Sequence, residues 1–144
     1  MSTLPAETPR QPSEAGSGSA LSDAAVLARE VRRLADRYRH LSESRLRARS
    51  NPDDPSDPGR TRAEAGLALA RTLAALGEAP DGHKVPDLGV FAVGDQIAVT
   101  GLDLAAYLGA RAEAAAGSDD RAAARCAAKL GSALREVRAV AALV

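Results

Sequence analysis

Arginine is the most prominent residue type in this sequence that could do chemistry. Between Leu27 and Arg49 the chain carries eight arginines and three acidic residues, a net charge of +5. Five of these arginines fall on or beside one stripe of a predicted helix: Arg29, Arg32, Arg33, Arg37 and Arg39. Like charges at helical spacing repel each other by about 0.2–0.5 kcal/mol per pair. Because an acidic protein or a polyanion would relieve this repulsion, we take the five arginines as candidate partner or polyanion contacts.

The plain alternative for these arginines is a solvated helix face. The following loop supplies three aspartates that would partly neutralise them: Asp53, Asp54 and Asp57. The whole chain has 19 basic and 19 acidic residues, and this zero net charge argues against a general affinity for nucleic acids or membranes. No segment resembles a helix-turn-helix with a recognition helix. Binding of a polyanion or nucleic acid is therefore the alternative hypothesis and not the leading one.

Catalytic, metal-binding and cofactor-binding motifs are not found in the sequence. His83 lies near Asp81 and Asp87, but one histidine with two loop carboxylates is a weak metal-binding set. Cys126 falls on the apolar face of a predicted helix, where a thiol is buried and inert. The glycines lie mostly at predicted caps and turns and form no phosphate-binding pattern. We therefore expect a protein without catalysis, metal or cofactor.

The stretch Val85–Leu108 organises the predicted fold. Two short apolar runs flank Gly94 and Asp95, and glycine at the first central position suits a type II′ turn. This pattern predicts a β-hairpin over residues 88–100. Since side chains alternate across a strand, one face of the hairpin would carry Val90, Ala92, Ile97 and Val99. A two-stranded ribbon is marginally stable alone in water, so we expect it to lie against helices.

Helical periodicity predicts four helices around the hairpin. The expected ranges are residues 22–42 with fraying towards 49, then 61–77, 100–117 and 118–144. Thr61 and Glu64 have the spacing of a capping box for the second helix. Thr100 and Asp103 have similar spacing at the start of the third, and Ser118 is placed to cap the fourth.

The first and last of these helices carry matching apolar seams with heptad spacing. The first seam consists of Ala24, Leu27, Val31, Leu34, Tyr38 and Leu41, and the last of Ala123, Cys126, Leu130, Ala133, Val137, Val140 and Val144. Such seams are typical of helices that pack along their length. We therefore predict that the two helices pack together in antiparallel orientation, unless they pair between chains.

The organisation of the chain follows from its composition. Residues 1–20 are rich in Pro, Ser, Gly and Thr with little apolar content, which predicts a disordered tail. Residues 21–144 then form a single domain of the α+β class, mostly α, with the hairpin between the second and third helices. The tail lacks a secretory signal, no run is long enough to span a membrane, and one cysteine excludes an internal disulfide. We expect a cytoplasmic protein.

The leading functional hypothesis is a small non-catalytic interaction or regulatory module. Its partner would be another protein or a second copy of the chain. The exposed side of the hairpin, or the end of a heptad seam, would provide the apolar contact surface. Two segments, Ser44–Leu46 and Gly89–Ala105, resemble a group of uncharacterised small proteins from G+C-rich bacteria. The resemblance implies no activity and transfers no site.

Overall fold

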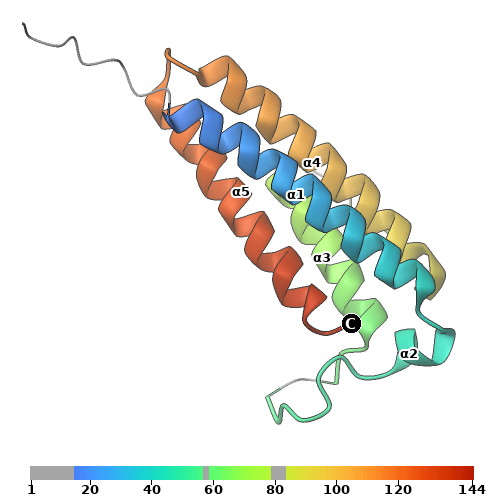
Figure 1. Ribbon diagram of the computed structural model, residues 1–144. Helices are drawn as coiled ribbons and strands as arrows, with labels where there is room; N and C mark the ends of the chain where they lie inside the picture. The colour runs from blue at the N-terminus through green and yellow to red at the C-terminus, as the bar shows by residue number, and fades with distance from the viewer. Residues whose placement is uncertain (1–14, 57–58, 79–83) are drawn as a thin grey trace, which may run out of the picture.

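The protein is a bundle of helices. The computed structural model describes residues 15–56, 59–78 and 84–144. The elements are α1 (Ala15–His40), α2 (Glu43–Arg47), α3 (Arg62–Leu76), the 3-10 turn η1 (Val90–Ala92), α4 (Val93–Ala115) and α5 (Asp120–Ala141). The four long helices lie side by side in an elongated bundle, and short α2 lies at one end of it (Figure 1).

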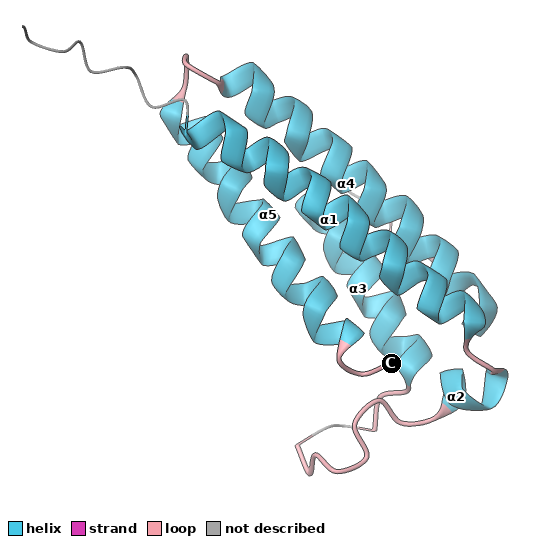
Figure 2. Ribbon diagram, in the orientation of Figure 1, coloured by secondary structure: helices cyan, strands magenta, loops and turns pink. Residues whose placement is uncertain are grey.

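The predicted β-hairpin over residues 88–100 is wrong. The turn η1 leads directly into α4, and the described part of the chain contains no strand (Figure 2). The fold class is therefore all-α and not α+β. The apolar residues of this stretch also satisfy helical spacing, and the buried face of α4 includes Val93, Ile97, Gly101, Leu104 and Leu108. Burial of that face against three other helices favours the helix over an isolated ribbon.

Gly94 serves a close helix contact and not a turn. It lies in the first turn of α4 facing α1, where a Cβ would come within 3.0 Å of the backbone oxygen of Ala35. At Gly101 a Cβ would lie 2.6 Å from both Cγ atoms of Val31. Gly109 continues this contact two turns further on, against Ala24. Gly94 and Gly101 let the backbones of α1 and α4 approach closely, whereas a Cβ at Gly109 would make an ordinary contact with Ala24.

The two heptad seams are buried as predicted over most of their length. Leu27, Val31 and Leu34 of α1 are at most 1% exposed, and Leu130, Ala133 and Val137 of α5 are equally well covered. The ends of the seams, such as Leu41 and Val144, are half-buried against the same core. Thus the sequence pattern identified the inner faces of both helices correctly.

Helix α1 starts earlier than predicted. It begins at Ala15 and not at Ser22, so the last six residues of the predicted disordered tail are helical. Ala20 is 4% exposed, because it extends the apolar seam one turn towards the N-terminus. Residues 1–14, the rest of the predicted tail, lie outside the described residues.

Helices α1 and α5 pack together, but they run parallel and not antiparallel (Figure 1). Near the end of α1, Arg37 donates a hydrogen bond to the carbonyl oxygen of Val144, just beyond the end of α5. The reason lies in the connections. Residues 84–92, here called the return segment, carry the chain back after α3, so α3 and α4 run the same way and α4 takes the antiparallel place beside α1.

The helix caps are partly as predicted. The Thr61 hydroxyl accepts from the Glu64 amide at 3.1 Å and the Glu64 carboxylate accepts from the Thr61 amide at 2.7 Å, which confirms the capping box of α3. Thr100 is not a cap, because it lies inside α4 and donates to the carbonyl oxygen of Gln96. Helix α5 is capped by Asp119 and not by Ser118.

The close contact at Gly101 predicts a specific pair of mutant stabilities. Replacement of either Gly101 or Gly131 by alanine gains about the same helix propensity, roughly 1 kcal/mol. At Gly131 the new Cβ meets only the mobile end of Arg135 at 3.5 Å, whereas at Gly101 it meets stiff Val31. Gly101→Ala should therefore be about 1–3 kcal/mol less stable than Gly131→Ala in urea unfolding. Equal stabilities would contradict the close approach.

Burial of Tyr38 predicts a loss of stability at high pH. Its hydroxyl donates to the carbonyl oxygen of Arg62 at 2.8 Å, and burial raises its pKa from 10.0 to about 12, although the charge of Arg62 opposes the shift. Because the Tyr38 pKa is higher in the folded state than in the unfolded state, the neutral hydroxyl contributes to the free energy of unfolding. This contribution is complete below about pH 10 and is lost between pH 10 and about 12. Tyrosinate absorbance should show this high-pKa step in the wild type and not in Tyr38→Phe.

Candidate functional site

The five candidate arginines of α1 do not act as one uniform surface. Arg33 lies 3.7 Å from Glu30, and Arg37 is bound to the carbonyl oxygen of Val144. Arg39 has two acidic partners, Asp36 in its own helix and Asp95 in α4, described below. Arg29 and Arg32 are exposed, and neither has a hydrogen bond or ion pair within the residues that the structure describes.

Arg39 joins α1 to the start of α4. Its guanidinium lies 2.8 Å from the Asp95 carboxylate and 2.9 Å from that of Asp36. The hydrogen bond to Asp95, followed by that to Asp36, raises the pKa of Arg39 above its ordinary value. All three side chains remain exposed to solvent, so the pairs contribute little to stability, but they neutralise this end of the arginine stripe.

The other chemistry-bearing residues are not brought together. Cys126 is 7% exposed on the seam of α5. His83 and Asp81 lie outside the described residues, and His40 is exposed, with Nδ1 2.7 Å from the carbonyl oxygen of Asp36. Within residues 15–56, 59–78 and 84–144, no three His, Cys, Asp or Glu side chains are grouped in a way that could hold a metal ion.

A polar cluster at the end of α3 ties three helices together. Glu78 accepts hydrogen bonds from Lys129 of α5 at 3.1 Å and from Tyr107 of α4 at 3.0 Å. Arg111 lies 5.7 Å from the centre of the Tyr107 ring. The hydrogen bond from Lys129, followed by that from Tyr107, lowers the pKa of Glu78. The cluster contacts three helices, and we therefore interpret it as a structural clamp.

Large apolar side chains are exposed in the return segment and in the second turn of α4. Leu88 and Phe91 are each 67% exposed and Val99 is 61% exposed; together we call them the apolar surface. The predicted hairpin placed Val99 on the same face as Ile97, but in the helix Ile97 is fully buried and Val99 points to solvent. The sequence analysis expected a contact surface on the exposed side of a hairpin without naming its residues, and the helix replaces that hairpin.

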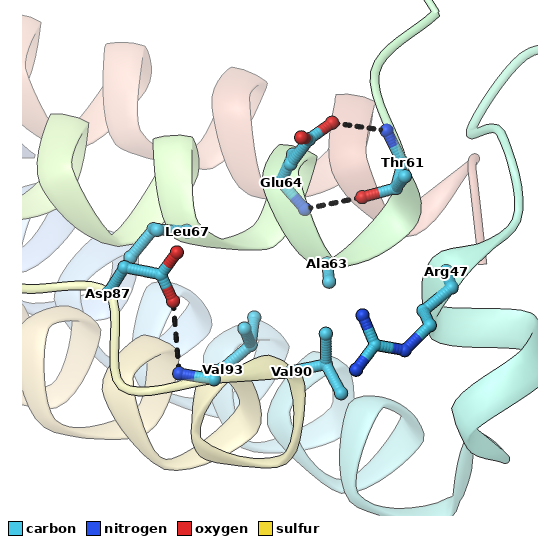
Figure 3. Close-up of a pocket in the computed structure, with 9 residues that line it drawn as sticks. Arg47, Thr61, Ala63, Glu64, Leu67, Asp87, Val90 and Val93 are labelled. Carbon is cyan, nitrogen blue, oxygen red and sulfur yellow. Dashed lines mark hydrogen bonds between the residues drawn. The ribbon is translucent and has the colours of Figure 1, made fainter.

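A pocket of about 360 Å³ lies between α2, the start of α3 and the return segment (Figure 3). Its lining consists of Arg47, Thr61, Ala63, Glu64, Leu67, Asp87, Gly89, Val90 and Val93. Arg47 and Asp87 approach it from opposite sides, with apolar side chains between them. Sequence reasoning missed this pocket, because its walls come from three segments that no local pattern relates to one another.

Comparisons with known proteins give no relative for this chain: no protein-family model, no curated protein and no solved structure matches it. The resemblance of residues 44–46 and 89–105 to a group of bacterial proteins therefore stays a prediction. Among the described helices, none combines the length and the apolar character needed to cross a membrane.

The different environments of Ile97 and Val99 predict different mutant stabilities. Ile97→Ala removes a fully buried side chain from the core and should lower the free energy of unfolding by about 2–5 kcal/mol. Val99→Ala changes a side chain that is 61% exposed and should alter it by no more than about 0.5 kcal/mol. Thermal or urea unfolding followed by circular dichroism measures both. Similar losses at the two positions would indicate the shared face of a hairpin.

Proposed function

We propose that the protein is a non-catalytic, cytoplasmic interaction module that binds a protein partner or a second copy of itself through the apolar surface. The observation that supports this proposal is the exposure of Leu88, Phe91 and Val99. Phe91 is the only phenylalanine in the chain, and it is left in solvent, where it contributes nothing to the core. Burial of such a side chain in an interface would gain about 1.5–3 kcal/mol.

The distribution of exposed apolar residues supports the same surface. Among the described residues, four large hydrophobic side chains are exposed, and three of them belong to the apolar surface. The fourth, Leu21, lies near the other end of the bundle, on α1. Single exposed apolar residues are ordinary on soluble proteins, whereas three within residues 88–99 provide a contact surface along one short stretch of the chain. The buried free thiol of Cys126 fits a reducing compartment such as the cytoplasm.

The second candidate function is binding of a polyanion or nucleic acid through α1. The observation that favours it is the lack of any ion pair for Arg29 and Arg32 among the described residues. Three of the original five arginines already have protein partners. If Arg29 and Arg32 alone contact phosphates, the logarithm of affinity should fall with the logarithm of salt concentration with a slope of about −2.

An affinity capture from the native cell tests the main proposal. The triple variant Leu88→Ser, Phe91→Ser, Val99→Ser should retain its fold, because all three side chains are exposed, and should lose the proteins that the wild type captures. Leu21→Ser is the matched control, since it removes an exposed leucine elsewhere and should retain them. Light scattering of the same variants tests self-association.

Two outcomes would contradict the interaction module. One is an identical set of captured proteins and an identical mass for the wild type and the triple variant. The other is a salt-dependent capture of nucleic acid that disappears in Arg29→Gln, Arg32→Gln and persists in the triple variant. The latter result would support the polyanion function instead.

A further inference from the structure

The pocket of Figure 3 has the dimensions and the walls of a small-molecule site. Its volume of about 360 Å³ falls within the range of roughly 300–1,000 Å³ that is usual for ligand pockets. Its floor is apolar: Ala63, Leu67 and Val93 are 6%, 9% and 3% exposed, and half-buried Val90 forms part of the wall. An aliphatic ligand would contact Val90 and the small part of the other three side chains that remains accessible.

Arg47 provides a positioned cation at one end of the pocket. Its Nε donates to the Glu43 carboxylate at 2.8 Å, which holds the side chain across one turn of α2. The two terminal nitrogens of its guanidinium have no partner among the described residues, and the group is directed towards Val90 at the pocket wall (Figure 3). Such a pair of N–H donors matches the two oxygens of a carboxylate.

Asp87 provides an anion at the opposite end. One of its carboxylate oxygens accepts from the Gly89 amide at 2.9 Å and so fixes the bend of the return segment. The other oxygen has no partner in the part of the chain that the structure describes. Asp87 and Arg47 form no ion pair with each other, because the apolar side chains separate them (Figure 3). The two terminal nitrogens of Arg47, whose Nε already pairs with Glu43, and one oxygen of Asp87 thus remain available to a ligand.

We propose that this pocket binds a linear zwitterion, which is a small molecule with an ammonium group at one end, a carboxylate at the other and an aliphatic chain between them. The carboxylate pairs with Arg47, the ammonium pairs with Asp87, and the chain lies on Ala63, Leu67 and Val93. Both charged side chains are exposed at the rim of the pocket, so a ligand with only one charge would gain one of the two ion pairs and not the other. An ω-amino acid and a short aliphatic peptide with free termini both belong to this class.

NMR titration of the full chain tests the charge requirement. The zwitterionic probes are 4-aminobutyrate, 6-aminohexanoate, Ala-Ala and Ala-Ala-Ala, which differ in the separation of their charges. At least one should produce saturable shifts of the Leu67, Gly89 and Val90 amide signals, with a Kd of about 1 mM or lower. Hexanoate and hexylamine, which carry one charge each, should bind about tenfold more weakly than 6-aminohexanoate or not at all.

Variants of the two charged residues test their roles. Arg47→Gln and Asp87→Asn should each weaken the best zwitterion about tenfold or more. Asp87→Asn keeps an oxygen for the Gly89 amide, so the bend of the return segment is preserved. Arg125→Gln and Asp103→Asn remove exposed charges outside the pocket and should leave the affinity unchanged.

Three results would overturn the proposal. They are the absence of saturable shifts with all four zwitterions, equal binding of a singly charged probe, and affinities that do not change in Arg47→Gln and Asp87→Asn. The apolar surface takes no part in this test. Failure of the zwitterion proposal would therefore leave the proposed interaction function intact, and failure of the interaction function would leave the zwitterion proposal intact.

Discussion

The contact between Val31 of α1 and Gly101 of α4 determines the arrangement of the bundle. A Cβ at position 101 would lie 2.6 Å from the Val31 side chain, so the two helices can reach this separation only because the residue is glycine. Gly94 lies at a second close contact of these helices, where a Cβ would come within 3.0 Å of the backbone oxygen of Ala35. Helix α4 is thereby drawn into the interior, where it contacts α1, α3 and α5 and supplies much of the core.

The functional surfaces follow from this position of α4. To place its first turn beside the end of α1, the chain must return along the bundle after α3, and the return segment makes that connection. Arg71 and Gln96 hold the segment by donating to the carbonyl oxygens of Val85 and Pro86. Asp87, Gly89 and Val90 of the return segment form one wall of the pocket. Phe91, which follows Val90 in the sequence, is exposed.

The elements that could be predicted from the sequence are those whose signal is local. The seams of α1 and α5 were predicted because a heptad pattern over several turns fits only a helix, and the capping box at Thr61 was predicted because its donors and acceptors are three residues apart. Residues 88–100 were misinterpreted because short apolar runs around a glycine fit both a hairpin and a buried helix. Which one forms depends on α1, and no pattern within the stretch itself contains that information.

Whether the charged groups of the candidate sites are free to bind a partner also depends on contacts between distant segments. The arginines of α1 were visible in the sequence, but the groups that bind Arg37 and Arg39 come from Val144 and Asp95, far along the chain. Likewise, Arg47 and Asp87 meet across a pocket only after α3 and α4 are placed. Charge patterns in one segment therefore predict which groups are present, whereas their availability depends on tertiary packing.

The most direct test of the close helix contact is a nuclear Overhauser measurement on the protein labelled at valine methyl groups. The contact predicts strong cross-peaks between the Val31 methyl protons and the α-protons of Gly101, together with helical chemical shifts for residues 93–115. Absence of these cross-peaks, with cross-strand signals between Val90 and Val99 in their place, would contradict it.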